Sequence, residues 1–247
     1  MDPSALVPTP DTIPAPWWVF EALGLLTFTA HLIAMNIALG GALLASWRAW
    51  RPRGSDLESR RRTPTALALA INLGVAPLLF VQVVHGHLLY SSSVLMALFW
   101  IAIIPTLILT YYGAYMAKGA AAGSTLLRVV APLVALLLLG VAFVFASNMT
   151  LMLTPARWVA WATHRDGTIL PLGEPSLWPR YLHAVTGAVA VAGLFSALVA
   201  AWRARRGGPQ ADTRPGLRLF AFATMAQVLV GMWYLMALPR HVMLLSM

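Results

Sequence analysis

The sequence has no cysteine and few charged residues. Only 10% of its 247 residues are Asp, Glu, Lys or Arg, against roughly 25% in an ordinary soluble domain. The absence of cysteine excludes disulfides, thiolate-ligated metals, iron–sulfur clusters and covalently attached c-type haem. The shortage of charge excludes a soluble globular enzyme, a disordered tail and a nucleic-acid-binding domain, so no nucleic-acid partner is expected.

Hydrophobic residues make up 60% of the chain, and the mean hydropathy is +0.75. They gather into six runs, each reaching the about 20 apolar residues that a helix needs to cross a bilayer. The predicted spans cover residues 17–47, 65–88, 94–117, 126–150, 178–202 and 217–238. The sequence therefore predicts an all-α protein, a polytopic membrane bundle of six transmembrane helices surrounded by lipid.

The basic residues predict which way this bundle faces. The formal net charge is +9, and thirteen of the seventeen basic residues fall near the loops that follow the first, third and fifth predicted spans. The positive-inside rule places these loops in the cytoplasm. Both termini then face outward, and the expected location is the inner (cytoplasmic) membrane of a bacterium.

The chain divides into two predicted parts. Residues 1–16 contain five prolines and are expected to form an extended outer arm. Residues 17–247 form the membrane domain, whose one long outer loop covers about 151–177. Trp158 and Trp161 in this loop are expected at the membrane interface, where tryptophan is enriched.

The histidines are the main functional candidates. All lie in or near the outer halves of the predicted spans or in outer segments: His31, His85, His87, His164, His183 and His241. An ionisable side chain inside a membrane is costly and points to a functional site. The alternative for each is a hydrogen bond to a neighbouring helix, and for the two outer ones, His164 and His241, simple hydration.

Imidazole in a metal site usually means zinc, copper or haem iron. A zinc or di-iron site is poorly supported without cysteine or a nearby buried carboxylate, so haem b between helices fits best. On a helix, His183 shares a face with Gly187, which would leave room for a flat macrocycle. Arg180 lies one turn further out, where it could pair with a haem propionate. Thr27 is placed one turn before His31 and could orient its ring.

His85 and His87 are two residues apart. On a regular helix their side chains point about 200° away from each other. They cannot face the same pocket unless Gly86 between them breaks the helix.

Stretches in four of the predicted segments resemble, in order, subunit I of the cytochrome bd quinol oxidases. The resemblance covers that subunit's first six helices and nearly this whole chain. The matching stretches are the run after His31 with Gly40, Gly41 and Leu44, residues 71–76 with Gly86 and 90–93, Asn148 with 152–155, and residues 181–187.

The resemblance implies the fold of those helices and two haem ligands. In the family, the histidine matching His31 ligates the oxygen-reacting haem, and the one matching His183 ligates the low-spin haem b. The third predicted span lacks the acids of the family's proton path. The family's quinol-binding loop, its later helices and its methionine and glutamate haem ligands fall outside the resemblance. His85, His87 and His241 have no counterpart in it.

A second imidazole makes a haem six-coordinate, and such a haem carries electrons without binding oxygen. We therefore expect one or two haems b in a relative of the oxidase subunit that only transfers electrons. The predicted axial pairs are His31 with His85 or His87, and His183 with His241 or a methionine such as Met236 or Met243.

The predicted function is that of a b-type cytochrome subunit passing electrons between the quinone pool (menaquinone or ubiquinone) and a periplasmic redox partner. The partner would be a cytochrome c or another redox subunit, in a multisubunit complex or a homodimer, with the haem sites toward the periplasm. If the complex is an enzyme, it is a quinol-linked oxidoreductase. Two alternatives stay open: a cytochrome bd-like quinol oxidase subunit, and a haem-free membrane anchor or transporter.

Overall fold

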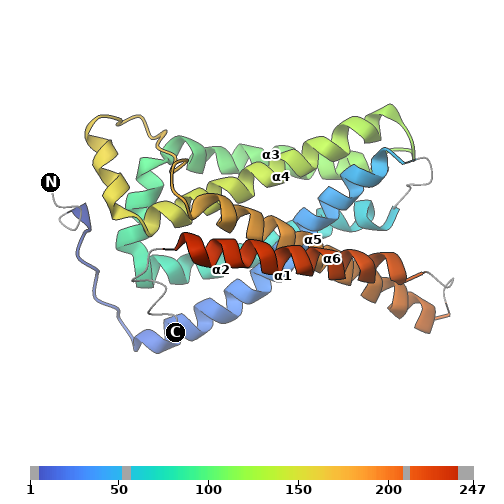
Figure 1. The fold of residues 1–247 in the computed structure, drawn as a ribbon, viewed down its shortest axis with the longest axis horizontal. Coiled ribbons are helices and arrows are strands. Elements are labelled where there is room, and N and C mark those ends of the chain that lie inside the picture. Colours follow the sequence, from blue (N-terminus) through green and yellow to red (C-terminus); the bar gives the residue numbers. More distant parts are fainter. Residues whose placement is uncertain (1–5, 52–56, 208–211, 239–247) are drawn as a thin grey trace.

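A computed structural model of the protein describes residues 6–51, 57–207 and 212–238, the side chains of 57–59 excepted. In this part of the chain six long helices run back and forth along one axis (Figure 1). Their bounds are α1 Trp17–Ala49, α2 Leu57–Leu95, α3 Ala97–Gly119, α4 Thr125–Met152, α5 Leu177–Arg205 and α6 Arg214–Ala237. A short 3-10 helix, η2 (Pro155–Ala162), follows α4.

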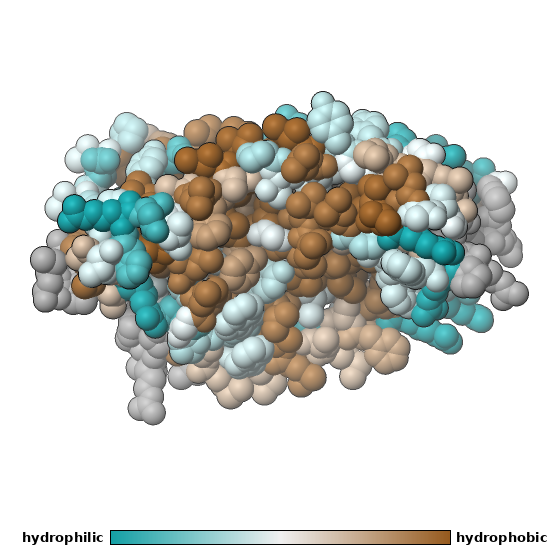
Figure 2. Space-filling view, turned by 90° about the horizontal axis from the view of Figure 1, so that it is seen from above, coloured by the Kyte–Doolittle hydropathy of each residue, from teal (hydrophilic) through white to brown (hydrophobic). Residues whose placement is uncertain are grey.

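All six helices are long and apolar enough to cross a membrane, and the described residues contain no strand. The predicted all-α, six-span bundle is therefore confirmed. The surface agrees, because Figure 2 shows an apolar middle with hydrophilic residues gathered at both ends. The described part of the predicted basic loops lies at the end opposite η2 (Figure 1).

Helix α1 is central to the packing. The most extensive contacts join α1 with α2 and α5 with α6, and α1 also packs on α5 and α4. The main core consists largely of alanine with a few leucine and valine side chains, drawn mostly from α1, α2, α3 and α4. Small side chains let membrane helices approach closely, which supplies the van der Waals contact that holds such bundles together.

The second helix is longer than predicted. It continues through 89–93 to Leu95, and only Met96 separates it from α3. The Ser91 hydroxyl donates to the His87 carbonyl and the Ser92 hydroxyl to the Leu89 carbonyl, so both serine hydroxyls find partners within the helix. The helix kinks at His85, whose φ of −127° and ψ of 25° are not helical.

Trp158 is buried inside the protein, and its depth in the membrane stays a prediction. Its side chain is only 4% exposed and packs against Leu95, Met96 and Leu151. Its indole N–H donates to the Leu151 carbonyl at 2.8 Å, which leaves no polar atom that needs water. Trp161 is 37% exposed.

Candidate functional site

His31 lies between α1 and α2. Its Nδ1 is 2.9 Å from the Ala70 carbonyl oxygen, and because a carbonyl only accepts, Nδ1 donates. The ring packs directly against Gly74 of α2, where a Cβ would lie 2.9 Å from the imidazole Cε1. Metal-ligating histidines commonly donate their second ring nitrogen to a backbone carbonyl in this way. The bond leaves Nε2 as the nitrogen that can accept.

Thr27 does not orient this ring. Its hydroxyl lies within hydrogen-bonding distance of the Leu23 and Gly24 carbonyl oxygens of its own helix, at 2.8 and 3.1 Å. A threonine in a helix can reach the carbonyl one turn back, and here this local bond outcompetes a contact with the imidazole. The ring is oriented from α2 instead.

His183 lies between α5 and α6. The Gln227 amide N–H donates to His183 Nε2 at 2.9 Å, and the Thr186 hydroxyl donates to the amide oxygen of Gln227. Nδ1 is buried, and no described residue gives it a hydrogen-bond partner. A buried polar atom without a partner costs about 1–3 kcal/mol. Because Nε2 accepts, the neutral ring carries its proton on Nδ1, which is a buried donor without an acceptor among the described residues. For Nδ1 to ligate a metal, the Gln227 amide would have to turn so that its oxygen accepts the proton of Nε2.

Two glycines flank this histidine. A Cβ at Gly231 of α6 would lie 3.2 Å from the His183 Cε1. Gly187 lies on the same face of α5 as His183, as predicted from the helix period. Both residues are next to the Gln227 amide of α6. A Cβ at Gly187 would lie 3.2 Å from its nitrogen. In the structure, the space at Gly187 is therefore occupied by Gln227.

Arg180 is one turn further out on α5 than His183. Its guanidinium lies 5.2 Å from the ring centroid of Tyr234 on α6. Its Nε is buried and has no hydrogen-bond partner among the described residues. Tyr234 follows Gly231 by three positions and Gln227 by seven, so one face of α6 meets one face of α5.

His85 and His87 are not brought to His31. Gly74 marks where the His31 ring meets α2. His85 lies eleven residues further along that helix, a distance of about 16 Å at the helical rise. His85 is exposed and His87 half-buried. One haem iron cannot take His31 and either of these as its two axial ligands in this arrangement.

The remaining candidates contribute no described ligand. His164 is exposed in the outer loop, where its Nδ1 contacts the Thr163 hydroxyl. His241 and Met243 lie outside the described residues. Met236 is described and is 75% exposed on α6. The second axial ligand predicted for His183 is thus not placed.

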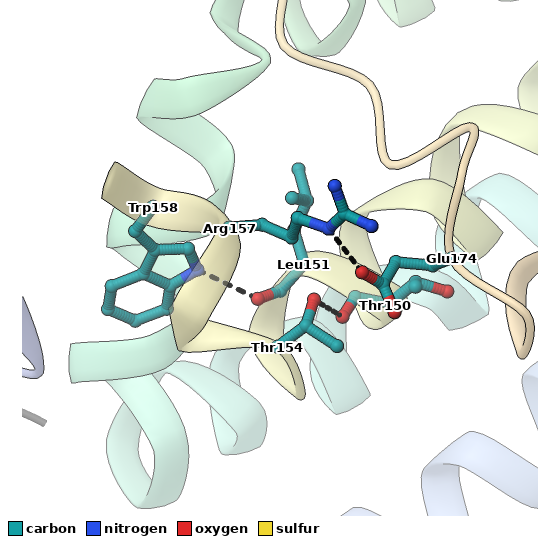
Figure 3. Close-up of polar contacts among 6 residues, drawn as sticks. All are labelled: Thr150, Leu151, Thr154, Arg157, Trp158 and Glu174. Atoms are coloured by element: carbon teal, nitrogen blue, oxygen red, sulfur yellow. Dashed lines mark hydrogen bonds and ion pairs between the residues drawn. The ribbon is translucent and has the colours of Figure 1, made fainter. Parts of the chain in front are cut away.

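The outer loop is fixed by its own polar contacts (Figure 3). Arg157 pairs with Glu174, and the Thr154 hydroxyl donates to the Thr150 carbonyl at 2.7 Å. In the same loop, hydrogen bonds from Thr168 to the Asp166 carboxylate keep the pKa of that carboxyl below its usual value. These contacts hold an ordered loop at the end of the bundle where α5 begins.

Within the described residues, no three His, Cys, Asp or Glu side chains come together in a group that could hold a metal ion. Haem iron makes a smaller demand, because the porphyrin supplies four ligands and the protein only one or two.

Sequence reasoning singled out His31, His183, Arg180 and Gly187 but not what they contact. The missed partners are Ala70, Gly74, Gln227, Gly231 and Tyr234. Gln227 was noticeable as a polar residue in an apolar span. Nothing in the sequence indicates that it faces His183.

A scan of protein-family models and searches of curated proteins and of solved structures found no match to this chain.

Proposed function

We propose that the protein is a membrane b-type cytochrome subunit that passes electrons between the quinone pool and a redox partner outside the membrane. His31 and His183 would each hold a haem b. The proposal rests on the chemistry of the two histidine sites and on the resemblance to subunit I of the cytochrome bd quinol oxidases.

The observation that carries the proposal is a pair of buried polar atoms without partners. They are His183 Nδ1 and Arg180 Nε, one helical turn apart on α5. A haem between helices presents iron to an imidazole and carboxylates toward the membrane surface. It would fit both sites if the Gln227 amide turned so that its oxygen accepted from Nε2–H, which would leave the Nδ1 lone pair for the iron, while the guanidinium would pair a propionate. His31 adds support, because its Nδ1 is held by a backbone carbonyl as in ligating histidines.

The protein's own groups would position and insulate such a cofactor. The Ala70 carbonyl fixes the orientation of the His31 imidazole, and Gln227 fixes that of His183. Haem b, when bound, supplies a one-electron couple near the outer end of the bundle. A carrier of electrons alone needs no proton path, which is consistent with α3 having no Asp or Glu.

One observation favours a haem-free anchor or transporter. The Thr186–Gln227–His183 chain is an interhelical hydrogen-bond network of the kind that joins membrane helices without any cofactor. In that case the histidine would serve α5–α6 packing only.

The test is a reduced-minus-oxidised optical spectrum of the purified full chain, with haem quantified as its pyridine haemochrome and carbon monoxide added to the reduced sample. We expect haem b with no response to carbon monoxide. This result requires a second axial ligand for each iron, which would come from outside the described residues or from a partner subunit. A carbon monoxide shift would contradict electron transfer through six-coordinate haem and favour an oxidase-like open site. If the protein contains no haem after expression with an adequate haem supply, the cytochrome proposal is wrong and the haem-free anchor or transporter is the remaining function.

A further inference from the structure

A cavity of about 230 Å³ opens at the basic end of the bundle, away from the histidines. It lies between α1, α2, α5 and the start of α6. Ligand pockets for drug-sized molecules have about 300–1,000 Å³, so this one suits a smaller group. Three arginines line it, Arg48, Arg62 and Arg203, against one acid, Asp212. Each of the three arginines also interacts with another residue of the chain.

The charge at this cavity is predominantly positive. Asp212 is exposed and accepts the backbone N–H of Arg214 at 2.9 Å, so this carboxylate also serves the start of α6. The Arg62 guanidinium lies 5.5 Å from the centroid of the Phe195 ring, which lines the cavity as well. Three guanidinium groups around one space match the planar, bidentate hydrogen bonding that phosphate oxygens accept.

The lining changes from charged to apolar along two helices. On α1 the lining residues Ile37, Gly41, Leu44 and Arg48 follow one face, so the arginine is about 16 Å from the isoleucine along the axis. On α5 the lining also ends at an arginine, Arg203, and its deeper members include Ala192 and Val199. A ligand that fills such a space has an anionic head and an apolar body.

We propose that this cavity binds the phosphate of an anionic phospholipid, with the lipid's glycerol and upper acyl chains against the apolar part of the lining. The positive-inside rule puts this end of the bundle at the cytoplasmic leaflet, where anionic headgroups meet basic pockets between helices. The inference is independent of haem, and it holds or fails whatever the spectrum shows.

The first experiment compares lipid retention by native mass spectrometry. The full chain is exchanged into nanodiscs of phosphatidylcholine and phosphatidylglycerol, and the phosphatidylglycerol kept after release is counted. The test variant is Arg62→Gln with Arg203→Gln. Its matched control is Arg61→Gln with Arg205→Gln, which removes the same charge from the same two helices at exposed residues outside the cavity.

We expect the wild type and the control to retain phosphatidylglycerol in preference to phosphatidylcholine. The preference of the test variant should fall further than that of the control, by about tenfold or more, because a charge-assisted hydrogen bond to the phosphate is stronger than the surface attraction that all four arginines share. Equal retention by the test variant and the wild type would overturn the proposal. An equal fall in the control would also overturn it, since the effect would then be one of surface charge.

A second measurement needs no variant and so does not depend on the variants' folding. The thermal unfolding of the wild type in phosphatidylcholine nanodiscs is followed with added phosphatidylglycerol or with inorganic phosphate. Phosphatidylglycerol should raise the unfolding temperature, and phosphate at the same concentration should not. If free phosphate stabilises the protein as well as the lipid does, the ligand is a soluble phosphate and the lipid assignment is wrong.

Discussion

At the scale of single residues, His31 and His183 are held in a similar way. Each has one ring nitrogen bonded to a neighbouring helix, His31 to Ala70 and His183 to Gln227. Each ring also packs against a glycine of that helix, Gly74 or Gly231. A Cβ at Gly74 would force the His31 ring to shift, whereas a Cβ at Gly231 would make a tight 3.2 Å contact with the His183 ring.

Gly74→Ala tests this packing. The added Cβ would lie 2.9 Å from Cε1 and 3.0 Å from Nδ1 of His31, so the ring must move away from the Ala70 carbonyl. We expect a loss of about 1–3 kcal/mol in stability, as for other overpacked sites, measured as a lower thermal unfolding temperature in detergent.

The matched control for that substitution is Gly140→Ala. Nothing lies within 4 Å of a Cβ at this exposed position in α4. Alanine favours helix over glycine by up to about 1 kcal/mol, so this variant should be as stable as the wild type or more stable. A similar fall in both variants would contradict the role assigned to Gly74.

The candidate histidines could be singled out from the sequence, but their contacts could not. A histidine in an apolar span, such as His183, is conspicuous because burying an ionisable group is costly. Its partner is set by how α6 is rotated against α5, and an apolar span gives little periodic signal for that rotation. Thr27 illustrates the limit, because its position one turn from His31 fitted a ring contact and the hydroxyl bonds its own helix instead.

At the scale of helices, α1 and α5 approach each other closely at Gly40. A Cβ there would collide with the Ala188 carbonyl oxygen and lie 2.6 Å from the Ala192 Cβ. Backbone cannot rotate away as a side chain can. This crossing therefore fixes the separation between the two helices that carry His31 and His183.

Gly40→Ala should force α1 and α5 apart. We expect destabilisation of about 3 kcal/mol or more, at the upper end for overpacked cores because the clash involves backbone. The control is the next residue, Gly41→Ala, whose Cβ would make an ordinary 3.7 Å contact with the Thr63 hydroxyl. Thermal unfolding of the two variants side by side is the measurement, and equal stability would show that α1 and α5 do not cross as described.

The existence of all six helices could be predicted, because the length of an apolar run is a direct signal of a membrane span. The ends were less predictable. The serine-rich run 90–93 is typical of a loop, yet it is helical, and the hydroxyls of Ser91 and Ser92 bond carbonyls of their own helix. The burial of Trp158 could not be predicted either, because it depends on a loop that packs over the α2–α3 junction.

At the scale of the whole molecule, the two ends of the bundle have different chemistry. The histidine contacts described above lie in the halves of α1 and α5 nearer the η2 end, and the arginine-lined cavity is at the other end. The alternation of helix direction produces this separation, since the odd helices begin where the even helices end (Figure 1). The distribution of basic residues along the sequence was sufficient to predict it.

The most direct test of the haem assignment is the haem content of three purified variants: His31→Ala, His183→Ala and, as the control, His164→Ala. His164 is exposed in the outer loop and should leave the haem content unchanged. We expect each of the other two to lose the haem b that its imidazole ligates, while the protein still inserts and purifies. Full haem content in both His31→Ala and His183→Ala would contradict the account.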